Sequence, residues 1–254
     1  MLAYSLCSGS SGNSYFIRGD ASSILIDAGR SARYITSALC DCGSGMGEIS
    51  AVFVTHNHSD HISALPVLCR QYAFDIFCTP GSADALLGVG IPESRIRRIL
   101  PGNRIAVGDF SVCAFETPHD ACGSVCYRVS DGCCSLAVAT DIGYVSDSVF
   151  ECLFGCSAVA VESNHDIDRL RCGPYPVFLK QRILSDSGHL SNDRCAALLP
   201  RLYDSGTRHF LLAHLSRENN DPDLAFETAS RALSGCDAEL AVALPEKPVC
   251  FFRG

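Results

Sequence analysis

The chain has 254 residues, of which 47% are hydrophobic, and this is enough to bury one sizeable core in a single domain over residues 1–254. Its formal net charge of −8 argues against indiscriminate binding of nucleic acid through a broad basic surface, although a local basic groove stays open. No window approaches the ~20 uninterrupted apolar residues of a membrane span, and the first residues lack the basic and apolar regions of an export signal. We therefore expect a soluble, cytoplasmic protein with no membrane partner.

Sixteen cysteines would suggest a disulfide framework in a small secreted chain. This chain is large and contains no paired C-x-x-C modules; CDC at 40–42 and CC at 133–134 come nearest. We expect most of the cysteines to be reduced and to serve as small core hydrophobes. A cysteine-rich zinc knuckle is the less favoured alternative.

Short apolar runs alternate with helical patterns and Gly/Pro punctuation, without long linkers or repeats. The stretch SYFIRGDASSILIDAG, residues 14–29, predicts a hairpin with Gly19 and Asp20 in its turn. Helices are predicted over residues 31–41 and 62–73.

Two further helices are predicted in the last quarter of the chain. SNDRCAALLPRLYDSG has Ser191 or Asn192 as a possible N-cap and Gly206 as a stop, and Pro200 is expected to kink or split this helix. NDPDLAFETASRAL begins with Asp221 before a proline, a common helix entry. Hairpins beside alternating strands and helices predict the α/β (α+β) class.

Two groups of basic residues are the candidates for a local basic groove. They are Arg95, Arg97 and Arg98 in one group, and Arg169, Arg171, Lys180 and Arg182 in a looser one. The simpler explanation for both groups is a solvated surface.

Five mostly apolar runs lead to a residue that can ligate a metal or move a proton. These residues are Asp27, His56, Asp141, Glu162 and His214. If the runs are strands of packed sheets, their ends converge on one edge, which is where active sites usually lie.

The stretch VFVTHNHSDHIS, residues 52–63, places three histidines and an aspartate within six residues. His56 and His58, at i and i+2, project to the same side of an extended segment. Asp60 and His61 follow as the chain turns into a helix, so they can face a neighbouring point. This geometry suits two adjacent divalent metal ions better than one. Histidine and carboxylate ligands suit zinc, manganese or iron, and the sequence does not choose among them. The alternative is a set of ordinary hydrogen-bonded histidines.

This His-x-His-x-Asp-His loop after a buried strand resembles the hallmark of the metallo-β-lactamase fold hydrolases, and the resemblance extends along nearly the whole chain. Asp27 is similar to the aspartate that supports the metal loop in that family. His119 in ETPHDA, Asp141 in ATDIGY and His214 in LAHLS are similar to the remaining ligands, in the family order.

The resemblance implies two metal ions and a four-layer αββα sandwich with the metal centre at one edge of two sheets. One ion would be held by His56, His58 and His119, the other by Asp60, His61 and His214, with Asp141 bridging them. This agrees with the separate expectation from the strand ends.

Four blocks point to one branch of the family. They are SLCSGSSGNSYFI near the start, ESNHD at 162–166, SDSGHLSN at 185–192 and LAHLSRENN at 212–220. Together they resemble the YycJ/WalJ-like bacterial proteins, which implies phosphodiester hydrolysis, as a 5'-to-3' exonuclease on DNA. Nucleic acid is then the expected partner. The sequence shows neither the large inserted domain of the bigger RNA-processing nucleases nor a long arm for gripping tRNA, so tRNA maturation is less favoured.

Phosphodiester cleavage also needs groups that move protons. Asp60 can orient the nucleophilic water or take its proton while it ligates a metal. A leaving 3'-alkoxide needs a proton that metal ligands cannot readily give. His189 in SGHLS is the best candidate, with Glu162 as the carboxylate that orients and charges it. The pair resembles the proton-donating pair of the tRNA 3'-processing nucleases, and the alternative for His189 is a loop hydrogen bond.

The loop SGSSGNS, residues 8–14, could cradle a phosphate through its backbone N–H groups and the side chains of Ser10, Ser11 and Asn13. Gly/Ser runs are more often simply turns. The loop lacks the lysine and the spacing of a Walker loop, which argues against nucleotide hydrolysis by that route.

Three functions stay open. A phosphodiesterase or nuclease comes first, a hydrolase of small esters, thioesters or lactones second, and a non-enzymatic metal- or phosphate-binding module third. The sequence does not indicate an oligomeric state.

Overall fold

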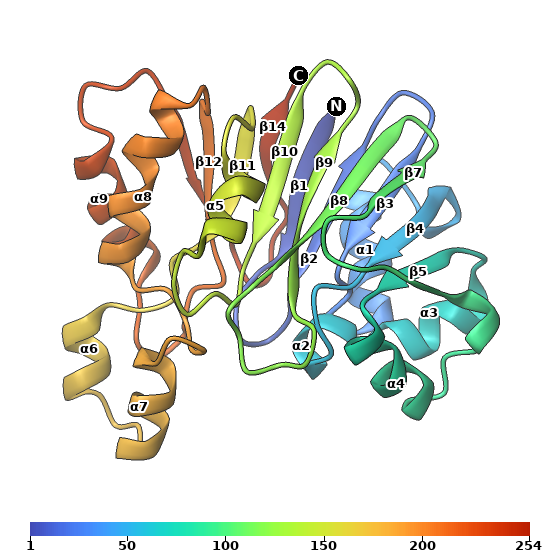
Figure 1. The fold of residues 1–254 in the computed structure, drawn as a ribbon, viewed down its shortest axis with the longest axis horizontal. Helices are drawn as coiled ribbons and strands as arrows, with labels where there is room; N and C mark the ends of the chain where they lie inside the picture. Colours follow the sequence, from blue (N-terminus) through green and yellow to red (C-terminus); the bar gives the residue numbers. More distant parts are fainter.

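Two seven-stranded sheets face each other in the computed structural model, which describes all residues 1–254 (Figure 1). The strands of the first sheet lie in the order β14 (Val249–Arg253), β1 (Leu2–Cys7), β2 (Ser14–Arg18), β3 (Ser23–Ile26), β4 (Ile49–Phe53), β5 (Asp75–Cys78) and β6 (Ile96–Arg98). The second sheet has the order β13 (Glu239–Val242), β12 (His209–Ala213), β11 (Ala158–Glu162), β10 (Ser135–Ala139), β9 (Val125–Ser130), β8 (Phe110–Glu116) and β7 (Arg104–Val107).

Helices cover the outer face of each sheet (Figure 1). The first sheet is accompanied by α1 (Ala32–Asp41), α2 (Ser59–Ile62), α3 (Leu65–Gln71) and α4 (Pro80–Gly88), and the second by α5 (Asp147–Leu153), α8 (Asn192–Asp204) and α9 (Pro222–Ala232). Two more helices, α6 (Ile167–Cys172) and α7 (Val177–Leu184), project beyond the sheets at the lower left of Figure 1. Short 3-10 helices precede β4 and β6, over Met46–Glu48 and Glu93–Arg95. None of the helices is both long enough and apolar enough to cross a bilayer.

Three buried apolar clusters hold these layers together. One cluster of 24 residues joins the first sheet to its helices, one of 23 residues lies between the sheets, and one of 20 residues joins the second sheet to its helices. The alternation of strand side chains is visible in β3, where Leu25 belongs to the outer cluster while Ile24 and Ile26 belong to the middle one. A strand buried on both faces must be apolar throughout, which explains the runs seen in the sequence. The predicted αββα sandwich and its α/β class are confirmed.

The parallel strands of each sheet place the candidate residues. β3 to β6 run parallel in the first sheet and β10 to β13 in the second. Asp27 and His214 directly follow β3 and β12, Glu162 ends β11, and Asp141 lies two residues beyond β10. The predicted convergence of strand ends on one edge is therefore confirmed.

Most of the predicted local elements are confirmed. The hairpin forms between β2 and β3. Ser191, rather than its neighbour, is the N-cap of α8, where its side chain accepts the N–H of Arg194. Asp221 caps α9 in the same way through the N–H of Asp223.

Three expectations were wrong in detail. The helix predicted over 62–73 is two helices, α2 and α3, because the second begins anew at Leu65 with a proline in its first turn. Of the two outcomes expected at Pro200, a kink or a split, the split does not occur: α8 runs unbroken because buried residues on both sides of the proline pack on the second sheet. All sixteen cysteines are free, but only seven are buried, so most are not core residues.

Candidate metal centre

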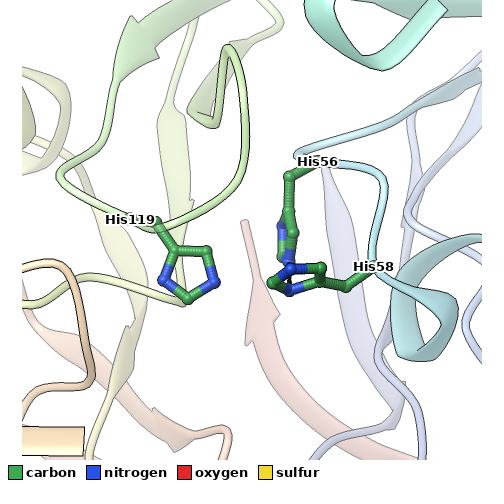
Figure 2. A group of neighbouring side chains, drawn as sticks. All are labelled: His56, His58 and His119. Carbon is green, nitrogen blue, oxygen red and sulfur yellow. Dashed lines mark hydrogen bonds between the residues drawn. The ribbon is translucent and has the colours of Figure 1, made fainter. Parts of the chain in front are cut away.

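Three imidazole rings converge from opposite sheets in Figure 2. His56 and His58 come from the loop after β4, and the Nε2 atom of His56 lies 3.0 Å from Nδ1 of His58. His119 comes from the loop after β8, and its Nε2 atom is buried without a hydrogen-bond partner. The three ligand atoms lie within 4.8 Å of one another, which is the spacing that a shared metal ion requires.

A second group lies beside the first and consists of Asp60, His61 and His214. The Oδ2 atom of Asp60 is 3.6 Å from the Nε2 atoms of both histidines. The Nε2 atom of His214 is buried without a hydrogen-bond partner. The structure thus brings together, in the two groups, all six residues predicted to hold the two ions.

The carboxylate of Asp141 faces both groups. Its Oδ2 atom is 3.2 Å from Nε2 of His61, and its Oδ1 atom is 3.8 Å from Nε2 of His119. Burial alone would raise the pKa of this carboxyl, but the charges of His214 and His61 lower the pKa well below its ordinary value. Asp141 is therefore ionised and placed where a bridging ligand would lie.

These His and Asp clusters suit divalent metal ions. Buried polar atoms without partners cost about 1–3 kcal/mol each, and three such atoms, on His119, Asp141 and His214, lie within the cluster. Burial opposes a charge on His61, but Asp141 and Asp27 outweigh burial and raise its pKa to about 10. A divalent cation would replace that proton, since only a neutral imidazole is a ligand.

Asp27 holds the ring of His61 from behind. Its Oδ2 atom is 2.7 Å from Nδ1 of His61 and accepts the hydroxyl of Thr55 at 2.8 Å. Its Oδ1 atom accepts the backbone N–H of Thr55 at 2.8 Å. A carboxylate on one ring nitrogen fixes the tautomer and directs the other nitrogen to the metal. The geometry therefore suits the supporting role expected for Asp27.

Glu162 holds two histidines at once. Its Oε1 atom accepts one hydrogen bond from Nδ1 of His189 and another from Nδ1 of His214, each at 2.8 Å. Its Oε2 atom accepts the backbone N–H groups of Ile142 and Leu190. Burial would raise the pKa of Glu162, but His189 and then His214 outweigh it and lower the pKa to about 2. Although Glu162 lies close enough to be a ligand, both of its oxygens are already occupied.

His189 stands at the mouth of the site. Its side chain is 20% exposed, whereas that of Glu162 is fully buried. Burial opposes its charge, but the charge and hydrogen bond of Glu162 raise the pKa of His189 above the ordinary value. Because Nδ1 is bonded to Glu162, Nε2 is the nitrogen left to meet a substrate.

The residues of the 8–14 loop lie in different places. Asn13 is fully buried: its Oδ1 atom accepts from Ser8 and Gly9, and its Nδ2 atom lies 3.2 Å from Nε2 of His61. Its side chain therefore supports the loop and does not face open solvent. Ser11 accepts a hydrogen bond from Arg30. Of the serines in this loop, Ser10 is the one that lines the cavity at the candidate metal centre.

Backbone strain marks the same residues. Three non-glycine residues have positive φ angles, namely Asp27, Asp141 and His214, at 60°, 57° and 56°. Left-handed backbone costs an ordinary residue about 1–2 kcal/mol. Such strain persists where the surrounding structure holds a functional geometry.

The sequence interpretation missed Thr55 and Asp120, and it named Arg182 only as a member of a basic group. Thr55 donates two hydrogen bonds to the carboxylate of Asp27. Asp120 brings its Oδ1 atom within 3.4 Å of Nε2 of His119, and its Oδ2 atom accepts Nε–H of Arg182 at 2.6 Å. The adjacency of Asp120 to a predicted ligand was a usable signal, whereas the position of Arg182 depends on the course of α7. The other basic group pairs locally, Arg97 with Asp75 and Arg98 with Glu93.

A family model described as "Beta-lactamase superfamily domain" matches residues 22–215. The chain belongs to this superfamily. The exodeoxyribonuclease WalJ of Streptococcus pneumoniae is 36% identical over 93% of this chain and 90% of the relative. The exodeoxyribonuclease YycJ of Bacillus anthracis is 36% identical over 90% of this chain and 87% of the relative.

The fold is also similar to that of a solved structure, the metallo-β-lactamase fold protein YhfI from Bacillus subtilis. The TM-score is 0.75 at 18% identity, over 98% of this chain and 99% of the other. Together with the relatives and the His/Asp clusters, this makes the chain a metal-dependent hydrolase.

Proposed function

We propose that the chain is an exonuclease that hydrolyses the phosphodiester bonds of DNA in the 5'-to-3' direction. The observation that carries this proposal is the bond of 2.8 Å between Glu162 and His189, which presents an imidazole beside the ligand groups. The names of the WalJ and YycJ relatives support it. Because the net charge is −8, we expect the DNA to contact the protein locally, at the site.

The proposal includes two divalent ions, of zinc, manganese or iron. One would be held by His56, His58 and His119, the other by Asp60, His61 and His214, with Asp141 between them. When bound, such ions polarise a phosphate and lower the pKa of a water molecule. We also propose that residues 1–254 form one domain, since the middle apolar cluster takes residues from both sheets.

Side chains of the protein would activate the water and protonate the leaving oxygen. Asp60, 25% exposed, would orient the attacking water and take its proton. The water oxygen forms a bond to phosphorus while the bond from phosphorus to the 3' oxygen breaks. His189 gives its proton to that oxygen, and Glu162 stabilises the charged ring before transfer. The products are a 5'-phosphate on the shortened strand and a free 3'-hydroxyl on the leaving nucleotide.

The second candidate is hydrolysis of a small ester, thioester or lactone, since the same ligands would serve it. A proton donor such as His189 favours the phosphodiester, whose alkoxide leaves poorly without a proton.

The test uses purified protein loaded with manganese or with zinc. It is incubated with 5'-labelled single- and double-stranded oligonucleotides and, separately, with thioester and lactone panels. Because cleavage in the 5'-to-3' direction removes the labelled nucleotide first, we expect the 5' label to appear directly as a released mononucleotide. Ester turnover without oligonucleotide cleavage under either metal would refute the nuclease proposal.

Metal analysis tests the ligand assignment. Because Asp141 faces both groups, Asp141→Ala should deplete both ions. Loss of one ion alone would show that Asp141 does not bridge.

A further inference from the structure

A cavity of about 250 Å³ opens beside the metal centre. It lies between α7, the His119 loop and the loop that carries His189, and its lining includes Asn164, Tyr175, Leu179, Arg182, Ser187 and His189. Apart from His119 and His189, the residues of this lining have no part in the proposed metal and proton-transfer machinery. The cavity therefore needs an explanation of its own.

The cavity is on the leaving-group side of the site. His189 lines both this cavity and the smaller one formed by the metal-ligand residues. Its Nδ1 atom is bonded to Glu162, so the proton it gives away comes from Nε2. The oxygen that receives this proton belongs to the nucleotide that departs, so that nucleotide must lie against His189.

Arg182 is the one arginine that lines both cavities. Its Nε atom donates to Asp120 at 2.6 Å, which fixes the guanidinium group at the cavity wall. Its two outer nitrogens make no hydrogen bond within the protein. They form the planar fork that arginine uses to bind phosphate oxygens in pairs.

The rest of the lining suits a nucleoside. Tyr175 and Leu179 supply an aromatic ring and an apolar side chain against which a base can lie. Asn164 is buried and donates its Nδ2 hydrogen to the carbonyl of His214, which leaves Oδ1 to accept a hydrogen bond from a ligand. The cavity, at about 250 Å³, is slightly smaller than the ~300–1,000 Å³ of typical small-molecule pockets, so it can take one nucleoside at most.

We propose that this cavity binds the terminal nucleotide that the enzyme releases, with Tyr175 against its base and Arg182 on its own phosphate. The proposal rests on the exonuclease function proposed above and explains why cleavage would release one nucleotide at a time. Asp120 is then a positioning residue, since it acts by holding Arg182.

The test measures binding of deoxyadenosine monophosphate and of deoxyadenosine to the metal-loaded protein by calorimetry. The wild type should bind the monophosphate more tightly than the nucleoside, by about 10-fold. Arg182→Ala should abolish this preference. Tyr175→Ala should weaken both ligands by about 10-fold, since stacking of a base on an aromatic ring contributes about 1–3 kcal/mol.

Two matched control variants lie outside the cavity. Phe178→Ala removes an aromatic ring that is 72% exposed and lies three residues after Tyr175, in α7, and Arg171→Ala removes an exposed cation of the same basic group as Arg182. Both should change binding by less than about twofold, as surface substitutions do. All four variants should retain the wild-type metal content.

The outcomes separate the two proposals. If Phe178→Ala weakens the nucleoside as much as Tyr175→Ala does, or if Arg182→Ala leaves the phosphate preference intact, the cavity is not the nucleotide site. Hydrolysis of bis(4-nitrophenyl) phosphate by the wild type reports on the metal centre without needing this cavity, because 4-nitrophenolate leaves without a proton from His189. If the protein hydrolyses the diester but does not bind the nucleotide, the cavity assignment is overturned and the exonuclease proposal is not. Absence of diester and DNA hydrolysis would refute the exonuclease, while the binding result would still decide the cavity.

Discussion

The two sheets support the candidate site in different ways. In the first sheet, one buried carboxylate, Asp27, holds one histidine of the candidate metal centre, His61. In the second sheet, one buried carboxylate, Glu162, holds both a histidine of that centre, His214, and the proposed proton donor, His189. Substitution of Asp27 should therefore affect metal binding alone. Substitution of Glu162 should affect metal binding and proton transfer together.

The largest effect is expected from Glu162→Gln compared with Asp27→Asn. An amide placed at Oε1 of Glu162 would point its N–H groups at the Nδ1 atoms of both histidines. The two rings would have to change tautomer or rotate. Nε2 of His214 would then no longer be available to a metal ion, and Nε2 of His189 would no longer carry a proton for the substrate. Asp27→Asn would disturb the tautomer and orientation of one ring only, that of His61. Loss of such a supporting carboxylate typically costs about 10–100-fold in metal affinity.

Metal titration separates the two variants. Activity of Asp27→Asn on oligonucleotides should return to near the wild-type level at high metal concentration. Activity of Glu162→Gln should stay low even at saturating metal, by about 100-fold or more, because the proton donor is also lost. Full rescue of Glu162→Gln by metal would show that Glu162 serves His214 only.

The next effect isolates the donor. His189→Ala should lower kcat by about 10²–10⁴-fold and leave the metal content unchanged, because His189 lies outside the two ligand groups and Glu162 can still hold His214. Activity is measured on oligonucleotides and metal by elemental analysis. A substantial loss of metal would show that His189 is itself a ligand.

The same contrast explains what the sequence could predict. In the first half, His56, His58, Asp60 and His61 are nearly consecutive, so strand and helix geometry alone indicates that they face two adjacent points. The apolar runs before each site residue also predicted the sheets and the edge at which they meet. Predicting these features needed no information about contacts between distant residues.

In the second half, contacts depend on loops brought together by the fold. Glu162 and His189 were paired through the need for a proton donor and through a resemblance, but nothing local indicated that Glu162 also holds His214, which lies 52 residues away. Asp120 and Arg182 are 62 residues apart, and their bond depends on where α7 lies. Loop packing of this kind leaves no periodic pattern in the sequence.

A smaller effect concerns packing in the first half. A Cβ atom on Gly29 would lie 1.6 Å from the backbone oxygen of Asp60, so Gly29→Ala must push the metal loop away. We expect a loss of about 2 kcal/mol or more in the free energy of unfolding, as for other overpacked sites, together with weaker metal binding. Gly47→Ala is the control, since nothing lies within 4 Å of its added Cβ atom. Urea denaturation of both variants checks this, and equal stabilities would contradict it.

The smallest effect concerns backbone strain, of which the second half holds more. Asp141 and His214 have positive φ angles there, whereas Asp27 alone does in the first half. Replacing Asp141 by Gly or by Ala removes the same carboxylate, but glycine accepts the left-handed backbone and alanine does not. In metal-free protein, Asp141→Gly should therefore be more stable than Asp141→Ala by about 1 kcal/mol. At Asp60, which lies in helix α2, the order should reverse, because glycine is the poorer helix former by about 1 kcal/mol. Urea denaturation of the four variants measures both differences. The same order at the two positions would mean that the strain at Asp141 is not stored in its backbone, and that the second half of the site gains its geometry from side-chain contacts alone.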